Sequence, residues 1–201
     1  IRDSSLTGGI GDDTLDGGLG NDVLTGGNGG DRFIVQAGAN ASITDLGLGG
    51  ADSLEVDSGG AVTAAVSRAW IATTTTFNNG RVTLNSTGQS INLSAITAGS
   101  NGFEIINRGT AAAFMGSALA DTLVGSSGND TLTGFLGSDT LTGGAGCDTF
   151  GFATATFDPI IGIDVQADVA TEGLEVDVLT DFTKGTSGVG DLIACTHGLV
   201  I

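Results

Sequence analysis

The chain is poor in several residue types that most globular folds use. Its 201 residues include no tyrosine, one tryptophan (Trp70) and one proline, so a conventional aromatic-rich core is not expected. There is no Gly-x-y period, which excludes collagen. Two cysteines, Cys147 and Cys195, allow one bridge at most and cannot make a disulfide framework. No apolar run reaches the ~18 residues of a membrane helix, and no signal-peptide pattern is visible.

Basic residues and histidine are also scarce. Six Lys and Arg stand against 23 Asp and Glu, which gives a net charge of −17. With so few cations to neutralise phosphates, nucleic acid is not an expected partner. The only histidine, His197, is not part of a His-Glu-x-x-His zinc motif. A nucleophile pair of Cys195 and His197 would lack a third, orienting group, so we expect no enzyme activity.

Glycine and aspartate dominate what is present, with 36 Gly and 19 Asp against only 4 Glu. Because Glu favours helices whereas Asp favours turns and calcium loops, this bias indicates ligation rather than helix surfaces. The net charge is −7 over residues 1–56, +1 over 57–120 and −11 over 121–201. The acidity therefore belongs to the two ends, where such dense carboxylates would repel one another without a counter-ion.

A nine-residue unit, Gly-Gly-x-Gly-x-Asp-x-Leu-x, recurs in both acidic ends. Three units cover residues 8–16, 17–25 and 26–34 without a gap, and four more lie between 116 and 151. A fixed period with one acid per unit indicates a repeat architecture that binds a hard cation. The glycines permit turns with positive φ, the Asp supplies a carboxylate, and the apolar eighth residue lies on a short strand. Since calcium takes 6–8 oxygens, a second, stacked turn must complete each site.

These units closely resemble the RTX (repeats-in-toxin) family of calcium-binding nonapeptides. The resemblance implies an all-β fold, a parallel β-roll with two nonapeptides per coil and several Ca²⁺ ions held between turns on the same side. The calcium-binding positions that it implies are Gly9, Gly11, Asp13, Gly18, Gly20, Asp22, Gly27, Gly29, Asp31, Asp121, Gly128, Asp130, Gly137, Asp139, Gly144, Gly146 and Asp148.

The resemblance also implies which turns pair around an ion, because each turn faces the next but one. The implied pairs are Asp13 with Asp31, Asp121 with Asp139, and Asp130 with Asp148. Asp22 instead faces Asn40 and Ala41, so its site lacks a second aspartate. The unit at 116–124 keeps only its first glycine, and we expect a distorted turn there. The units at 125–133 and 134–142 lack the second glycine alone, which is a milder departure.

We predict three parts along the chain. The first is a roll block with trailing strands over residues 1–56, the second is a neutral β-rich spacer over 57–115, and the third is a second roll block over 116–201. The third part also carries an acidic segment, residues 150–179, which is either an irregular calcium loop or a solvated acidic surface, and C-terminal strands near 179–182 and 191–193. The sequence leaves open whether the spacer continues the solenoid or forms its own sandwich.

Several strands are expected within the spacer itself. Residues 73–77 and 81–84 flank Asn78-Asn79-Gly80, which predicts a β-hairpin. Further strands are expected at residues 61–70, 90–93 and 102–107.

The function expected from these features is structural. The chain begins in the middle of a repeat and is expected to be a fragment of a secreted or cell-surface bacterial protein, such as an S-layer, adhesin or filament component. The resemblance implies type I secretion, with folding on calcium binding after export. Its partners would be calcium, neighbouring repeats of the same chain and other copies. The alternative is a carrier or secretion module of an RTX enzyme or toxin whose active domain lies outside this fragment.

Overall fold

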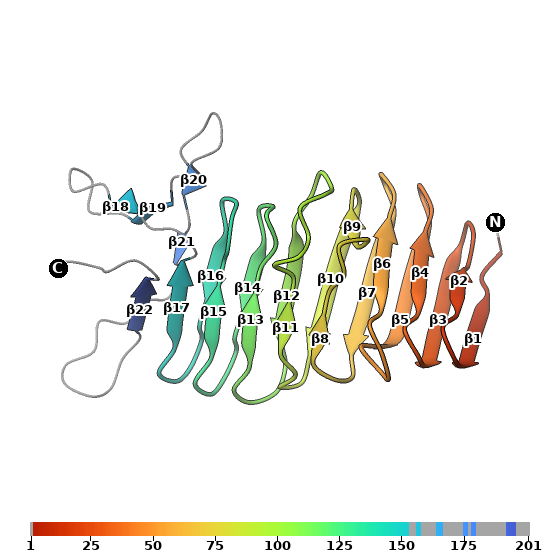
Figure 1. The fold of residues 1–201 in the computed structure, drawn as a ribbon, viewed down its shortest axis with the longest axis horizontal. Coiled ribbons are helices and arrows are strands. Elements are labelled where there is room, and N and C mark those ends of the chain that lie inside the picture. The colour runs from red at the N-terminus through yellow and green to blue at the C-terminus, as the bar shows by residue number, and fades with distance from the viewer. Residues whose placement is uncertain are drawn as a thin grey trace.

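The computed structural model describes residues 2–152 and, beyond them, only the backbone of five short strands between residues 156 and 195. Every regular element in this described part is a β-strand, and nearly all of the strands pair in parallel. Along most of the described chain, successive strands alternate between two faces of an elongated solenoid, except that β8 and β9 both lie on the same face (Figure 1). The predicted all-β fold, a parallel β-roll, is therefore confirmed. The described residues contain no helix that could span a membrane.

One face of the solenoid is a nine-stranded parallel sheet that runs through both repeat blocks and the spacer. Its order is β1-β3-β5-β7-β10-β12-β14-β16-β21. The strands are β1 (Ser5–Ile10), β3 (Asn21–Asn28), β5 (Asn40–Leu46), β7 (Ala61–Val66), β10 (Arg81–Ser86), β12 (Phe103–Asn107), β14 (Thr122–Val124), β16 (Thr140–Thr142) and β21 (Val178–Leu179).

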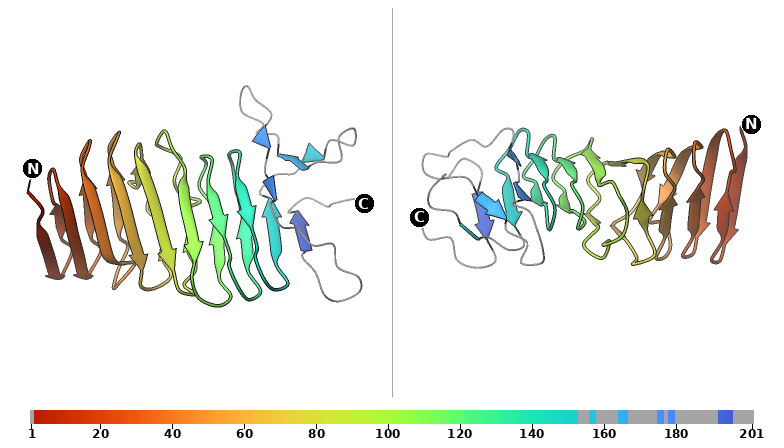
Figure 2. Two further views of the ribbon diagram at one scale, coloured as in Figure 1. Left: turned by 180° about the vertical axis from the view of Figure 1, so that it is seen from behind. Right: turned by 90° about the horizontal axis from the view of Figure 1, so that it is seen from above.

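The opposite face is divided into two parallel sheets. Figure 2 shows the solenoid from behind and from above. The first contains β2 (Thr14–Asp16), β4 (Arg32–Val35), β6 (Ser53–Val56) and β9 (Phe77–Asn78). The second contains β8 (Trp70–Ile71), β11 (Ile91–Asn92), β13 (Ala113–Met115), β15 (Thr131–Thr133), β17 (Thr149–Phe152) and β22 (Leu192–Cys195). A separate antiparallel sheet joins β18 (Thr156–Phe157), β19 (Asp164–Gln166) and β20 (Glu175–Val176).

The apolar eighth residue of every nonapeptide points into the solenoid. These side chains are at most 3% exposed, and they are Leu15, Leu24, Phe33, Leu123, Leu132, Leu141 and Phe150. They stack on the same position of the neighbouring coil, as Leu123 does on Leu141. Because a single coil could not enclose this apolar row, stacking of coils makes the core.

The spacer continues the same solenoid, which decides between the two alternatives that the sequence left open. Strands β7, β10 and β12 pair in parallel with one another, and β12 pairs with β14 of the second block. In the spacer Ala61 pairs with Arg81, whereas in the second block Thr122 pairs with Thr140, so the spacer coils are slightly longer than the repeat coils. The division at residues 56 and 115 into three parts remains a prediction.

The predicted hairpin at Asn78-Asn79-Gly80 is wrong. The strand before this turn, β9, pairs in parallel with β6, and the strand after it, β10, pairs in parallel with β7 and β12. The turn therefore carries the chain from one face of the solenoid to the other. The strand expected at 61–70 is instead two strands on opposite faces, β7 and β8. Strands are present near the other expected positions, as β11, β12, β21 and β22. Most of the acidic segment at 150–179 lies outside the described residues.

Candidate metal centre

The turns that join the two faces stack along two edges of the solenoid. We call the turns that lead out of the nine-stranded sheet the exit edge, and those that lead back into it the return edge. The exit edge carries Asp13 and Asp31 in the first block and Asp130 and Asp148 in the second. The return edge carries Asp22, Asp121 and Asp139. Each of the three predicted aspartate pairs lies in adjacent coils of one edge.

The ten glycines of the predicted site share one backbone conformation. All have φ between 77° and 146°, the region that side chains rarely adopt. They are Gly9, Gly11, Gly18, Gly20, Gly27, Gly29, Gly128, Gly137, Gly144 and Gly146. Two of the three units that lack the second glycine nevertheless keep this conformation, because Ser126 and Phe135 adopt φ of 81° and 83° in its place. The turn geometry is therefore kept at the cost of backbone strain of about 1–2 kcal/mol per residue.

The aspartates form a ladder of hydrogen bonds from coil to coil. The backbone N–H of Asp13 donates to Oδ1 of Asp31 at 3.0 Å. The same bond, at 2.8 Å, joins Asp121 to Asp139 and Asp130 to Asp148. One oxygen of each accepting carboxylate is thus fixed by a hydrogen bond from the preceding coil. The other oxygen does not take part in this ladder.

In several of these carboxylates the second oxygen has no donor at all. Oδ2 of Asp13, of Asp31 and of Asp130 is buried and accepts no hydrogen bond. A buried carboxylate oxygen without a partner is costly, and a cation is the usual way to satisfy it. Asp31 and Asp130 are each 1% exposed, so water does not serve this role freely.

Main-chain oxygens gather at the same points. A methyl group on Gly8 would lie 2.5 Å from Oδ2 of Asp13 and 2.7 Å from the carbonyl oxygen of Gly26, one coil away. The second block repeats this arrangement: a methyl group on Gly125 would lie 2.6 Å from Oδ2 of Asp130 and 2.5 Å from the carbonyl of the next coil. Carboxylate and carbonyl oxygens from two coils are the donor set that calcium prefers. The residues present therefore fit calcium.

Burial raises the pKa of several of these carboxyl groups. For Asp31 the main cause of the raised pKa is burial, to which the negative charge of Asp13 adds. For Asp130 burial again comes first, and the charge of Asp148 adds to it. Burial also raises the pKa of Asp52 and of Asp121 to about 6. The ionised form of each group is thus disfavoured until a counter-charge is supplied.

Two aspartates outside the predicted set extend the exit edge. Asp52 accepts the N–H of Asp31 at 2.9 Å, which is the ladder bond of the repeat units. Its second oxygen, however, accepts the N–H of Gly47 at 2.6 Å. Asp45 is also fully engaged, because its two oxygens accept the N–H groups of Gly26 and Gly27. The ladder therefore ends in carboxylates that protein donors already satisfy.

A sequence signal for Asp52 was present but weak. Residues 47–55 keep a first glycine, the Asp and the Leu of the nonapeptide, but Leu48 stands at the second position. This unit is also out of phase with the three units at 8–34. A strict search for nine-residue spacing therefore misses it.

A second ladder, which the sequence did not suggest, runs from the fifth position of the unit. Asp12 accepts the N–H of Gly30, and Asn129 accepts that of Cys147, both one coil further on. The side chain at position five thus accepts a hydrogen bond from the following coil, whereas the side chain at position six accepts one from the preceding coil. Asp22 lacks the pairing of the other aspartates: it accepts the N–H of Ser4 at 2.8 Å, and on its other side stands Ala41.

Neutral side chains close the turns of the spacer. Buried Asn78 donates to the carbonyl of Gly102 at 2.6 Å and accepts the N–H of Gly80 at 2.9 Å. Buried Asn107 similarly accepts the N–H of Gly109. These turns satisfy their backbone groups without a cation.

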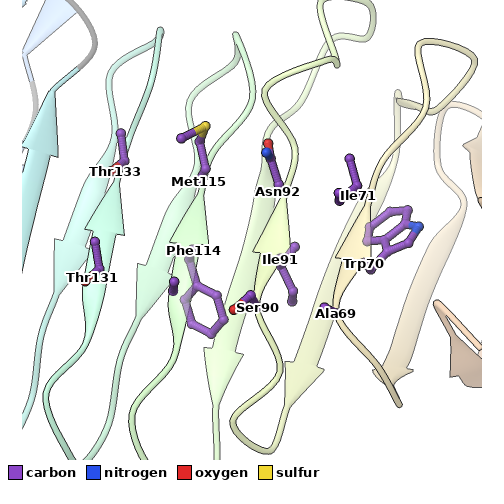
Figure 3. A pocket seen from close by; sticks show the side chains of 11 residues that line it. Ala69, Trp70, Ile71, Ser90, Ile91, Asn92, Phe114, Met115, Thr131 and Thr133 are labelled. Carbon is purple, nitrogen blue, oxygen red and sulfur yellow. The ribbon is translucent and has the colours of Figure 1, made fainter. Parts of the chain in front are cut away.

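A shallow apolar groove of about 320 Å³ crosses strands β8, β11, β13 and β15 (Figure 3). Ile71, Asn92, Met115 and Thr133 line it, and none of its lining residues is charged. It is therefore not a cation site. Within the described part of the chain, no three His, Cys, Asp or Glu side chains converge, so any bound ion must take carbonyl oxygens as well.

The stacked Gly-Asp turns on a parallel solenoid define a calcium-binding β-roll. Residues 3–40 and 115–150 match the family profile of the RTX calcium-binding nonapeptide repeat, in four copies. These two segments match the family that the nonapeptides resemble, as the sequence predicted. Residues 41–114 lie outside the match. No curated protein and no solved structure gives a significant match to the chain.

Proposed function

We propose that the chain is a calcium-dependent structural module of a secreted or cell-surface bacterial protein. The observation that carries this proposal is the set of buried, donor-free carboxylate oxygens on Asp13, Asp31 and Asp130. They lie where carboxylates and carbonyls of adjacent coils meet, so an ion there would join the coils and offset their repulsion. In this proposal the ions lie between the turns of Asp13 and Asp31 and of Asp130 and Asp148.

The cellular setting follows from the affinity expected of such sites. Extracellular calcium modules have dissociation constants of about 10⁻⁴–10⁻³ M, so they bind calcium far more weakly than cytosolic sensors do. A chain of this kind would leave the cell by type I secretion with its acidic turns empty and would complete its folding outside. The continuous nine-stranded sheet supports a role as an extended scaffold, as in an S-layer, an adhesin or a filament.

Circular dichroism and thermal melting in calcium, in magnesium and in chelator test this proposal. We expect calcium to add β signal cooperatively and to raise the melting temperature. Magnesium should do little, because it demands octahedral geometry and loses water reluctantly. An identical spectrum and melting curve in calcium and in chelator would overturn the proposal.

The scaffold role has its own test. Sedimentation and electron microscopy of the calcium-loaded chain should give elongated particles, alone or joined into ordered arrays. Compact particles with no elongation would contradict a scaffold role while leaving calcium binding intact.

A further inference from the structure

One turn on the return edge differs from all the other repeat turns. In the unit at 116–124, Ser117 stands where the second glycine belongs. The residues at this position in the three following units, Ser126, Phe135 and Gly144, have φ of 81°, 83° and 97°. Ser117 does not share this positive φ. Its peptide group is therefore oriented differently from those of the other turns.

The consequence is a changed environment for the aspartate of the same unit. The backbone N–H of Ser117 donates to Oδ2 of Asp121 at 2.5 Å, and the Ser117 hydroxyl donates to the same oxygen at 2.8 Å. Oδ1 of Asp121 accepts the N–H of Phe103 at 2.6 Å. Ser117 is fully buried and Asp121 is 2% exposed. Both carboxylate oxygens of Asp121 are thus satisfied by the protein.

Asp130, in the next unit, provides the contrast. Its Oδ1 accepts the N–H of Ala112 at 2.7 Å, much as Asp121 accepts that of Phe103. Its Oδ2 is buried and has no donor. Oδ1 of Asp130 also accepts the side-chain N–H of Asn107 at 3.4 Å. The two turns differ most at Oδ2, and the residue that makes this difference is Ser117.

The remaining oxygens of a calcium turn are nevertheless in place around Asp121. A methyl group on Gly116 would lie 2.8 Å from Oδ2 of Asp121 and 2.2 Å from the carbonyl oxygen of Gly134. This matches the arrangement at Gly125. The carboxylate and carbonyl oxygens of a calcium turn are thus present, but two protein donors stand where a cation would act.

We propose that Ser117 replaces a cation at Asp121, so that this side of the predicted Asp121–Asp139 site is closed and the site is latent rather than occupied. This inference rests on the proposed function. A cation could reach Asp121 only by displacing two hydrogen bonds in a buried site, each donor then being left without a partner. The spacer is joined to the second block at this point by the bond from the Phe103 N–H to Asp121, without calcium, and Ser117→Gly would open the site.

Calcium stoichiometry, measured by equilibrium dialysis and atomic absorption on the full chain, tests the proposal. Asp121→Asn should bind as many ions as the wild type, whereas Asp130→Asn should bind at least one fewer. Ser117→Gly should gain one ion. Ser126→Gly is the matched control. It restores the second glycine of the unit that contains Asp130, whose Oδ2 already has no protein donor, so its ion count should not change.

Melting in chelator shows whether the Ser117 donors close the turn or whether the turn only tolerates a serine at this position. In chelator, Ser117→Gly should melt below the wild type, because Oδ2 of Asp121 loses the hydroxyl donor, while Ser126→Gly should melt at or above it. The inference is overturned if Asp121→Asn loses an ion as Asp130→Asn does, or if Ser117→Gly gains none. If instead Asp130→Asn keeps every ion, the ligand assignment of the proposed function itself fails.

Discussion

The backbone N–H of Asp13 donates to Oδ1 of Asp31, one coil further along, and leaves Oδ2 of Asp31 buried without a donor. The same carboxylate thus stabilises the stacking of two coils and presents an unsatisfied charge. Removal of that charge should have opposite effects on the stability of the fold with and without calcium, because the buried charge is destabilising until an ion is bound.

Asp31→Asn tests this reversal of sign. The amide keeps an acceptor for the Asp13 N–H but carries no charge. In chelator the variant should melt several degrees above the wild type, and in calcium it should melt below it, as followed by scanning calorimetry. Asp57→Asn, at an exposed position in a spacer turn, is the control and should shift neither curve appreciably. A shift in the same direction under both conditions would contradict the prediction.

Gly8→Ala should disrupt the first calcium turn. The added methyl group would lie 2.5 Å from Oδ2 of Asp13 and 2.7 Å from the Gly26 carbonyl, both closer than van der Waals contact permits. We expect loss of an ion and a lower calcium-dependent melting temperature. Gly30→Ala is the control, because a methyl group there meets nothing nearer than 3.3 Å and the backbone needs no positive φ. Equal effects of the two substitutions would refute the steric argument.

Ser126→Gly should stabilise the fold by about 0.5–1 kcal/mol, because it relieves a positive φ of 81° at a small entropic cost in the unfolded chain. Ser127→Gly, at the next residue, should destabilise it, since Ser127 has no positive φ and its hydroxyl donates to the carbonyl of Gly109 at 3.1 Å. Denaturant unfolding in calcium measures both. A loss of stability in Ser126→Gly would show that the strain is absent.

Stability should depend on pH in opposite directions in chelator and in calcium. Burial raises the pKa of Asp52 and of Asp121 to about 6 and also raises the pKa of Asp31 and of Asp130. Below pH 6 and above the ordinary aspartate range, the folded chain therefore binds more protons than the unfolded chain, so unfolding becomes harder as pH falls. In calcium, protons compete with the ion for Asp31 and Asp130. We expect this loss to exceed the gain at Asp52 and Asp121, so stability should fall over the same range.

Melting temperatures at pH 5.0 and 7.5 check this prediction, with calcium and with chelator at each pH. The chelator samples should be more stable at the lower pH and the calcium samples less stable. Parallel shifts in the two series would show that Asp31 and Asp130 do not take part in calcium binding.

Asn78→Ala should destabilise the spacer equally in calcium and in chelator. The substitution leaves the Gly102 carbonyl and the Gly80 N–H without their partner, at a cost of about 1–3 kcal/mol per buried group. Asn85→Ala is the control, because Asn85 meets only the exposed side chain of Arg108. Trp70 is the only tryptophan, is 1% exposed and donates to the carbonyl of Asp52. Its fluorescence therefore reports on the unfolding of this central region. A loss of stability that differs between calcium and chelator would contradict the prediction.

Much of the fold could be predicted from the nonapeptide because each position has a local physical role. The Leu at position eight faces inward, the glycines take positive φ, and the length of a repeat coil follows from two units. The error at Asn78-Asn79-Gly80 has a physical cause. An Asn-Gly turn signal is local, whereas β9 and β10 find their partners in neighbouring coils, far from the turn in the sequence.

The candidate site was harder to predict where the motif is imperfect. A missing glycine at position 117 looks the same in the sequence as one at position 126, yet Ser117 turns its donors onto Asp121 and Ser126 keeps the calcium-turn conformation. Asp52 was not predicted as a site residue because its coil is longer than two nonapeptides. Side-chain donors and coil length, rather than residue identity alone, decide which aspartates keep a carboxylate oxygen available to a cation.

The parallel pairing of coils also determines how the molecule would respond to mechanical force. Hydrogen bonds between parallel strands run across the strands, which in this solenoid is along the long axis. A pull on the two ends would therefore break one coil junction at a time, and each coil of two nonapeptides released would extend the chain by about 60 Å. An ion between the turns spans the same junctions, so the calcium concentration around the protein would set the force at which the repeat blocks begin to unwind, while the neutral coils between them would yield at a force that calcium does not change.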